Sequence, residues 1–306
     1  MNWIGRHVAH SLVPSLFALL LLAGGAQGKN PSAARSGEVQ AETQAVEAGV
    51  EESEDTATSL SDEVLDGREI YRRMLANKYR RGVQKVEIVS SDPGGSEQAT
   101  AFTASLEDNR DENEEPVDGK NASLLIEVTS PFDMRHTRYL MIAREPGPDD
   151  EFIYKPSDRL VRRVDLKSTP LLGTDYTFDD LAYHDIDGAE YKRLPDEVVA
   201  GLTVFVVDAL VTDLRTSQVH RSLSYIEQEH YIPIKVRYWD EYDVEIKEMN
   251  VDVESIRSYG ETWIAARSTM RDLLLGTSSR SNLLSLDTTP KFNRQHFSQR
   301  RLSQGN

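Results

Sequence analysis

The sequence predicts a mainly β fold in which one large antiparallel sheet is closed or half closed into a barrel and helices are few. Three observations lead to this class. About a dozen runs of strand-forming residues follow one another at spacings of roughly 8 to 15 residues. Gly, Pro, Asn and Asp, which favour turns, separate these runs. In residues 235–239 and 244–247 charged side chains occupy every second position, as a sheet with one solvated face requires.

The N-terminal segment has the pattern of a secretory signal peptide. Arg6 precedes an apolar run at 12–23, and the triplet 26–28 has the small-x-small form of a cleavage site. The apolar run is shorter than the roughly 20 residues that a membrane span needs, which favours cleavage over retention as an anchor. We expect residues 1–28 to be removed and the mature protein to lie in the periplasm if the source is a Gram-negative bacterium.

The net charge of −16 among 306 residues is confined to two stretches. Residues 36–67 contain ten acidic and no basic side chains, and residues 107–119 contain seven acidic side chains against Arg110. The rest of the chain is neutral, so nucleic acid, whose phosphates require a basic surface, is not an expected partner. The chain has no cysteine, which excludes disulfides, cysteine metal sites, thiol nucleophiles and a lipid-anchored cysteine.

The first elements after the signal peptide are a linker and a helix. Residues 29–61 lack aromatic side chains and carry a block of like charge, so they cannot bury enough apolar surface to offset their ordering entropy. We predict a disordered acidic linker there. A helix with one broad apolar face is predicted to begin at Ser61 and to end within 77–82. The folded domain is therefore expected over residues 62–306.

The rest of the domain reads as strands. They are predicted over residues 83–90, 99–106, 122–129, 138–144, 151–154, 160–164, 191–194, 202–210, 220–227, 232–239, 243–252, 261–271 and 280–286. Residues 202–207 are apolar on both faces, so this strand should lie under another element or line an interior. The acidic stretch 107–119 reads as an insertion between two strands. The basic tail at 289–306 is expected to be a solvated terminus, with contact to an anionic membrane surface as the alternative.

Motifs for common enzyme classes are absent from the sequence. There is no Gly-x-Ser-x-Gly elbow, no phosphate loop and no dinucleotide fingerprint. The histidines beyond the signal peptide do not occur at the i, i+4 spacing of a helical zinc pair: His136, His184, His220, His230 and His296. We therefore expect a protein that is not an enzyme, with no catalytic residues, no metal and no cofactor.

One stretch carries more information than the rest. Residues 154–164 read as two strands joined by a Pro-Ser-Asp turn, and residues 171–181 read as a turn at Gly173 that leads into a short helix. Thr177 and Asp180 have the spacing of a capping box, with Asp in place of Glu. Two interpretations stay open, namely a buried corner that holds a loop against the sheet and a lid that faces a ligand.

The same stretch contains charged residues that we expect to be structural. Arg162 and Arg163 are predicted to form ion pairs with Asp175 or Asp179. The full set of motif residues with an expected structural role is Arg162, Arg163, Gly173, Thr174, Asp175 and Asp179.

These residues carry a resemblance to a known family. Its marks are Gly67-Arg68-Glu69-Ile70, Tyr154-Lys155-Pro156 with Arg162-Arg163-Val164, the run Leu172-Gly173-Thr174-Asp175-Tyr176-Thr177-Phe178-Asp179-Asp180-Leu181, residues 234–240, Trp263 with Met270, and Phe292 with Phe297. Over about residues 66–302 the chain resembles the bacterial outer membrane lipoprotein-sorting protein family, relatives of the LolA/LolB lipoprotein carriers. It departs from the family at 152–156, where a Trp-Leu-Tyr-Leu-Pro pattern is common, and in the acidic insertion.

The resemblance implies an α+β fold, an unclosed antiparallel β-barrel of about eleven strands whose concave face is covered by short helices. It implies a periplasmic, monomeric carrier that binds lipid or lipoprotein acyl chains in an apolar cavity and moves them towards the outer membrane. The alternative is a non-catalytic adaptor subunit that docks on an inner-membrane lipid exporter of the resistance-nodulation-division type. The side chains expected to form the lipid-binding wall and lid are Tyr139, Met141, Leu172, Tyr176, Phe178, Leu181, Phe205, Trp239 and Trp263.

Overall fold

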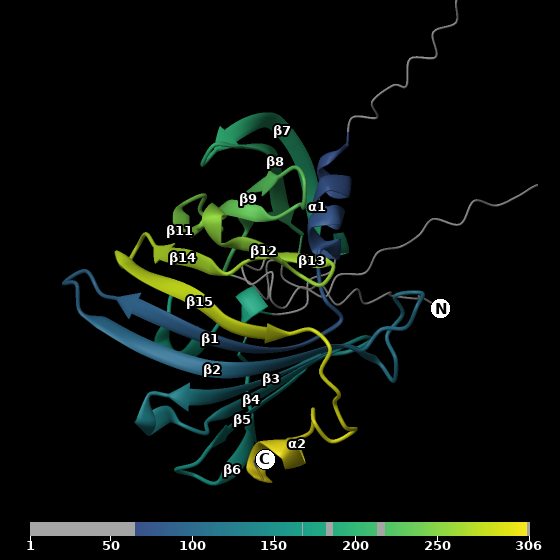
Figure 1. The fold of residues 1–306 in the computed structure, drawn as a ribbon, viewed down its shortest axis with the longest axis vertical. Coiled ribbons are helices and arrows are strands. Elements are labelled where there is room, and N and C mark those ends of the chain that lie inside the picture. Colours follow the sequence, from purple (N-terminus) through teal and green to yellow (C-terminus); the bar gives the residue numbers. More distant parts are fainter. Residues whose placement is uncertain (1–64, 167, 182–185, 213–217, 305–306) are drawn as a thin grey trace, which may run out of the picture.

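The computed structural model describes residues 65–166, 168–181, 186–212 and 218–304. The predicted signal peptide and acidic linker lie outside the described residues. One antiparallel sheet of 13 strands, in the order β6-β5-β4-β3-β2-β1-β15-β14-β11-β10-β9-β8-β7, curves around a segment of loops and short 3-10 turns (Figure 1). The predicted class, an unclosed antiparallel barrel with few helices, is confirmed.

The strands follow the predicted order closely. The large sheet contains β1 (Arg81–Ser91), β2 (Glu97–Asp108), β3 (Lys120–Ser130), β4 (Arg138–Arg144), β5 (Asp150–Lys155), β6 (Leu160–Arg163), β7 (Ala189–Val199), β8 (Leu202–Val211), β9 (Arg221–Glu227), β10 (Pro233–Trp239), β11 (Glu245–Val251), β14 (Arg267–Asp272) and β15 (Thr277–Asp287). The strand predicted over 261–271 is divided at Ala266, and its first half, β13 (Thr262–Ala265), pairs with the unpredicted β12 (Ile256–Tyr259) in a separate hairpin.

The first and last strands pair in the middle of the sheet, where Figure 1 shows β15 (yellow) between β1 and β14. β1 and β15 are antiparallel and in register from Val83 opposite Asp287 to Ser91 opposite Ser278, with one bulge. The sheet is therefore continuous only because the first and last strands of the domain pair with each other.

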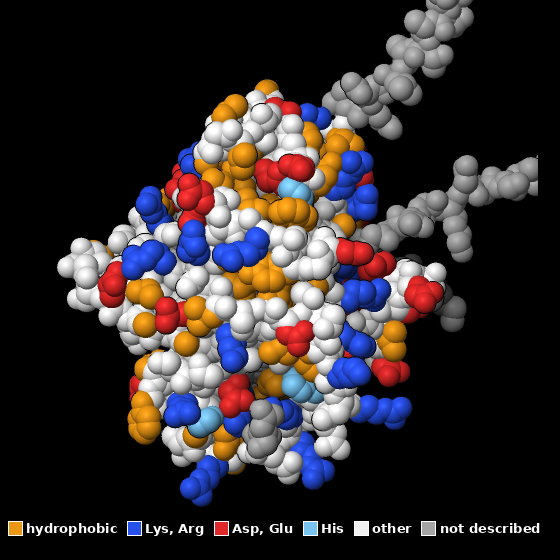
Figure 2. Space-filling view, in the orientation of Figure 1, with side chains coloured by type: hydrophobic (Ala, Val, Ile, Leu, Met, Phe, Trp, Pro, Cys, Tyr) orange, Lys and Arg blue, Asp and Glu red, His pale blue; other side chains and the backbone are white. Residues whose placement is uncertain are grey.

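Alternation along β10 separates the two faces of the sheet. Ile234, Val236 and Tyr238 are buried, whereas Lys235 and Arg237 are only partly covered. Lys235 forms a 3.0 Å salt bridge with Glu248 of the neighbouring strand. On the face seen in Figure 2, Lys and Arg side chains gather over β11 and β14, so the outer surface is solvated as the alternation predicts.

Helix α1 (Gly67–Ala76) covers the start of the β7–β8 hairpin. Its N-cap is Asp66, whose carboxylate accepts a 2.7 Å hydrogen bond from the Glu69 N–H. The helix buries Ile70, Tyr71, Met74 and Leu75 against Val207 of β8, which accounts for one apolar face of that strand. The predicted start at Ser61 lies outside the described residues, and the cap at Asp66 marks where the described helix begins.

The second face of β8 is also covered. Val204 and Val206 are buried in a cluster with Leu223 and Tyr225 of β9. The prediction that residues 202–207 lie under another element or line an interior is therefore confirmed on both sides of the strand.

The basic tail is not a solvated terminus, contrary to the sequence-based expectation. Helix α2 (Gln299–Gln304) places Leu302 in a buried cluster with Leu140 and Phe152 of the sheet. Arg138 of β4 donates a 2.9 Å hydrogen bond to the Leu302 carbonyl. The short helix docks because it covers the apolar outer face of β3 to β5, a tertiary requirement that the composition of the tail does not reveal.

The acidic stretch 107–119 forms the connection between β2 and β3 and is held by a buried ion network. Arg110 makes two hydrogen bonds to the Asp108 carboxylate, at 2.9 and 2.7 Å, and approaches Glu114 at 3.1 Å. Lys78, just after α1, lies 3.4 Å from Asp108. Arg110 within the stretch and Lys78 outside it therefore hold the stretch against the domain, so that it is not fully solvated.

Short 3-10 turns complete the architecture: η1 (Phe132–Met134), η2 (Leu171–Gly173), η3 (Asp179–Leu181), η4 (Ile186–Gly188) and η5 (Val253–Ser255). In the described part of the chain, neither α-helix has the length and apolar character needed to cross a membrane.

We expect Gly67→Ala to destabilise the fold although alanine is the better helix former. A Cβ at this position would lie 2.7 Å from the Arg193 amide nitrogen and 2.8 Å from the Lys192 carbonyl carbon of β7. Backbone cannot yield as a side chain does, so a loss of about 1–3 kcal/mol is expected in urea unfolding. Gly94→Ala is the control, because its Cβ would face only the Asp92 side chain at 3.2 Å; an equal loss there would contradict the packing argument.

A second prediction concerns pH. Burial, with the nearby Arg110 charge, lowers the pKa of Lys78 from 10.5 to about 8. Between these two values the unfolded chain holds one more proton than the folded chain, so this group makes stability rise with pH by about 3 kcal/mol in total. Subtracting the unfolding free energy of Lys78→Met from that of the wild type at pH 7.5 and pH 10.5 isolates this contribution. A difference that stays constant with pH would show that the ammonium is not buried.

Candidate functional site

The candidate site is the concave face of the sheet, which is divided into an apolar and a polar region. The apolar region is formed by side chains such as Phe102, Ile126, Tyr139 and Met141 of β2 to β4. The polar region lies where Ser90 of β1 and the start of β15 meet, with a 2.9 Å contact between the Ser90 and Ser279 hydroxyls. The concave face therefore combines an apolar surface with a region of hydrogen-bonding groups.

The concave face is filled by residues 168–181, a segment that we call the plug. Its apolar side chains enter the same core as the strands: Leu171, Leu172, Tyr176, Phe178 and Leu181, all of them buried. The Phe178 ring meets Tyr139 of β4 with 4.8 Å between ring centroids. The plug therefore occupies the space that an apolar ligand on this face would take.

The plug is tied to the polar region by Asp175. The Asp175 carboxylate accepts hydrogen bonds from the Thr277 hydroxyl and, at 2.6 Å, from the Ser279 hydroxyl. The Asp175 N–H donates to Ser279 Oγ at 2.9 Å, and the Lys247 ammonium donates to the Asp175 carbonyl at 3.0 Å. We call these four contacts the latch. The latch satisfies a carboxylate that would otherwise be costly to place against the sheet.

The turn that presents Asp175 depends on local backbone chemistry. Leu172 and Gly173 both have left-handed φ angles, 55° and 79°, and the Leu171 N–H returns to the Tyr176 carbonyl at 2.7 Å. Glycine suits the second position because it adopts this conformation without strain. The hydroxyl of Thr174 donates to the Leu171 carbonyl at 2.8 Å and closes the turn.

The predicted capping pair is present in the last part of the plug. The Asp180 carboxylate accepts a 2.6 Å hydrogen bond from the Thr177 N–H, and the Thr177 hydroxyl accepts a 3.4 Å contact from the Asp180 N–H. The predicted short helix is only the 3-10 turn η3. Tyr176 reaches the Ser268 hydroxyl at 3.0 Å, and burial raises the pKa of Tyr176 far above its usual range, so the phenol remains neutral.

The predicted ion pairs from Arg162 and Arg163 to the plug are wrong. Arg162 pairs with Asp158 at 2.9 Å, and Arg163 pairs with Asp150 at 3.2 Å, both beside the short edge strand β6. The reason is position: an edge-strand arginine finds a carboxylate within its own hairpin at little entropic cost. The entrance to the plug is held instead by Glu151, a buried carboxylate that accepts a hydrogen bond from the Leu166 N–H.

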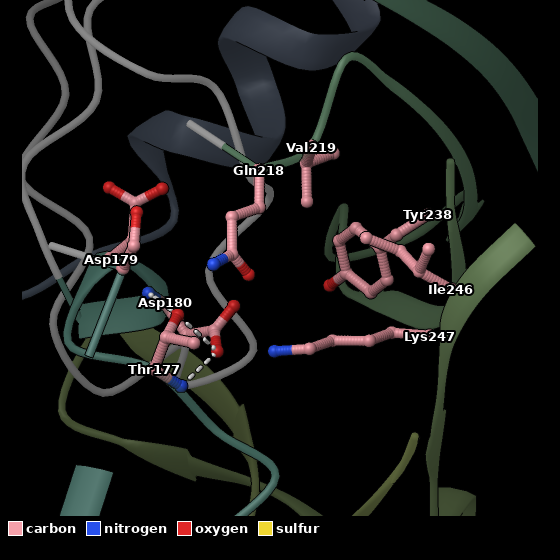
Figure 3. Close-up of a pocket in the computed structure, with 9 residues that line it drawn as sticks. Thr177, Asp179, Asp180, Gln218, Val219, Tyr238, Ile246 and Lys247 are labelled. Atoms are coloured by element: carbon pink, nitrogen blue, oxygen red, sulfur yellow. Dashed lines mark hydrogen bonds between the residues drawn. The ribbon is translucent and has the colours of Figure 1, made fainter. Parts of the chain in front are cut away.

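Among the described residues, two spaces that adjoin the plug differ greatly in size. One is a small cavity of about 20 Å³, which has room for about one water molecule and no acyl chain. Figure 3 shows Asp180 and Lys247 pointing into this cavity from opposite sides, with Tyr238 and Ile246 on the same side as Lys247. The other is an open groove of about 630 Å³ between the plug, the β1–β2 turn and the β14–β15 turn, beside the latch.

The structure brings six of the nine predicted lipid-binding residues together. Tyr139, Met141, Leu172, Tyr176, Phe178 and Leu181 all belong to the cluster on the concave face. The remaining three lie elsewhere. Phe205 packs under α1 with Tyr231, and Trp239 lies between Arg221 and Arg237 at 5.0 Å from each. The Trp263 ring meets the His230 ring in a tilted arrangement, with 3.8 Å between the ring centroids.

Sequence reasoning did not identify the residues of β15 and β11 that hold the latch. Thr277, Ser279 and Lys247 look like an ordinary solvated strand face, because polar residues on alternate positions usually face water. Glu151 was also not identified, since its burial and its contact with the Leu166 N–H are tertiary. Within the part of the chain that the structure describes, no cluster of three or more His, Asp or Glu side chains has the geometry to hold a metal ion.

A family model with the description "Uncharacterized protein" matches residues 120–304, which is more than half of the chain. The chain belongs to this family. No curated protein matches it.

Several solved structures share its fold. An outer membrane lipoprotein-sorting protein domain from Vibrio parahaemolyticus has 22% identity and a TM-score of 0.68, covering 78% of this chain and 98% of its own. A DUF1329 family protein from Desulfovibrio piger has 18% identity and a TM-score of 0.69, covering 77% and 97%. A LolA superfamily protein from Nitrosomonas europaea has 16% identity and a TM-score of 0.60, covering 77% and 99%. The chain thus has a LolA-like fold, and the resemblance stated from its motifs is confirmed at that level.

We expect Phe178→Ala to destabilise the protein by about 3–5 kcal/mol, because it removes a buried ring from the concave core. Thermal and urea unfolding measure the effect. Leu160→Ala, on the exposed side of β6, is the control and should change stability by less than about 0.5 kcal/mol. A near-neutral Phe178→Ala would mean that the plug is not packed in solution.

Proposed function

We propose that the protein is a non-catalytic carrier that binds acyl chains of lipids or lipoproteins on the concave face of its sheet. The observation that carries the proposal is the plug, which covers the apolar wall with apolar side chains while its polar turn is latched to β15. Such a segment can leave the wall without breaking a strand pair. The LolA-like fold supports the same reading.

Acyl binding is energetically adequate without any catalytic group. A chain of about sixteen carbons gains on the order of 12 kcal/mol on leaving water, at about 0.8 kcal/mol per methylene. Part of this gain offsets the exposure of Leu171, Leu172 and Phe178 when the plug moves away. Tyr139 and Met141 would then form the wall, as expected from the sequence. Phe205, Trp239 and Trp263 are left out of the proposed wall because they lie in other clusters.

The proposal places the carrier in the periplasm, where it moves its cargo towards the outer membrane. The signal-peptide pattern of residues 1–28 supports this location. Free acyl chains have very low solubility in the aqueous space between two membranes, so a carrier with a closable apolar face has a physical role there.

A second candidate is a non-catalytic adaptor that docks on an inner-membrane exporter of the resistance-nodulation-division type. Two observations favour it. The concave face is filled by the plug, and the pocket between the plug, β10 and β11 has a volume of only about 20 Å³. In addition, β7 is the last strand of the sheet, so its outer edge pairs with no other strand among the described residues.

A disulfide across the latch separates the two candidates. The chain has no cysteine, and the Asp175 and Ser279 side chains are hydrogen-bonded, so Asp175→Cys with Ser279→Cys creates a single bridge between plug and sheet. We expect the reduced form to take up a fluorescent fatty acid, and the oxidised form to take up at least tenfold less. The matched control is Asp175→Ser with Ser279→Cys, which lacks the bridge under both conditions.

Lipid extraction of the purified processed protein, followed by mass spectrometry, tests the cargo directly. Equal uptake by the oxidised and reduced forms would place acyl binding away from the plug. A protein that neither yields lipid nor binds fatty acid in any form would contradict the carrier and leave the adaptor.

A further inference from the structure

The turn between β14 and β15 exposes three consecutive leucines. Leu273, Leu274 and Leu275 are 44%, 64% and 68% exposed, although leucine is among the residues most often buried. They occupy the tip of a hairpin, and Figure 1 shows this turn at the same end of the sheet as the β1–β2 turn. A Cβ on Gly276 would lie 3.8 Å from the Pro93 ring of that neighbouring turn, so the two tips are adjacent.

The backbone N–H groups of this tip need no water to satisfy their hydrogen bonds. The N–H groups of Leu274 and Leu275 both donate to the Asp272 carboxylate, at 2.9 and 2.8 Å. The Gly276 N–H donates to the Asp272 carbonyl at 3.0 Å, and the Leu273 N–H donates to the Ile246 carbonyl at 2.9 Å. Every amide from residue 273 to 276 therefore has an acceptor within the protein. Each unsatisfied N–H group adds to the cost of moving a loop out of water, and this part of the cost is absent at the tip.

The tip also stands beside the open groove. Leu275 is one of the residues that line the groove, together with Asp175 and Lys247 of the latch and Gly173 of the plug. A surface that met the leucines would therefore also face the groove and the outer side of the latch.

The shape of the feature favours a lipid surface over a protein partner. A stable protein interface needs about 800 Å² on each side and a complementary shape, and three side chains on a narrow hairpin cannot supply that area. A bilayer interface accepts a protruding apolar tip without shape complementarity, and its affinity scales with the apolar area that is buried.

We propose that the β14–β15 turn inserts Leu273, Leu274 and Leu275 into the interfacial region of a phospholipid bilayer and so docks the protein with its groove facing the membrane. This docking does not depend on the cargo, because a protein without an acyl ligand presents the same tip. It adds a membrane contact to the proposed carrier function and stands or falls separately from it.

Co-flotation with phosphatidylcholine vesicles tests the proposal, using the processed protein purified from cells that express the full chain. We expect the wild type to float with the vesicles, and Leu274→Ser with Leu275→Ser to lower the partition coefficient at least tenfold. Leu284→Ser is the matched control, since Leu284 is 55% exposed but lies within β15, away from the tip, and it should bind as the wild type does. Unfolding curves check that all three proteins are equally folded.

Three results would overturn the proposal. The first is a wild type that does not float with pure lipid, and the second is a Leu284→Ser variant that loses as much binding as the tip variant. The third is a wild type that binds only vesicles carrying membrane proteins, which would assign the leucines to a protein partner. The fatty-acid uptake assay keeps the two proposals apart, because the tip variant should still take up fatty acid from solution. Uptake without flotation would support the carrier and contradict the membrane contact. Flotation without uptake would support the membrane contact and contradict the carrier.

Discussion

The packing of the plug against the concave face is the interaction on which the rest of the structure depends. A strongly curved open sheet has an inner face that would expose a large apolar area if nothing filled it. Phe178 and its neighbours fill that face, and Asp175 fixes the plug through Thr277 and Ser279. These contacts join strands from the two ends of the chain, since β15 pairs with β1. The open sheet and the seated plug therefore stabilise each other.

In the proposed carrier, the same interaction determines the net free energy of ligand binding. Any acyl chain on this wall must replace the plug side chains, so its gain in burial is partly offset by theirs. The latch is polar and lies at the edge of an open groove, whereas the apolar contacts are deep in the core. In the proposed carrier, release of the plug can therefore begin at the latch, where hydrogen bonds exchange with water at small net cost. The apolar side chains of the plug leave the core only if a ligand takes their place.

The strand pattern was predictable because it is local. Alternation in β10 and the apolar run in β8 define which residues face inward, and the capping pair Thr177 and Asp180 is a contact over three residues. The candidate site was only partly predictable. The plug motif and the β4 wall were found from residue types, but Trp239 is as apolar as Tyr238 and lies on the opposite face between two arginines. Residue type alone does not distinguish a wall residue from an outward one.

The sequence by itself determined the class of the fold, the order of its strands along the chain, the confinement of the net negative charge to two stretches and the absence of thiol chemistry, because these follow from composition and from short-range periodicity. The tertiary structure alone decided that Asp175 meets Ser279, 104 residues away, that Leu302 covers the outer face of the sheet, and that Leu273 to Leu275 remain outside it. The physical reason is that these outcomes depend on the order of the strands within the sheet and on its curvature, which bring together segments that no local pattern relates.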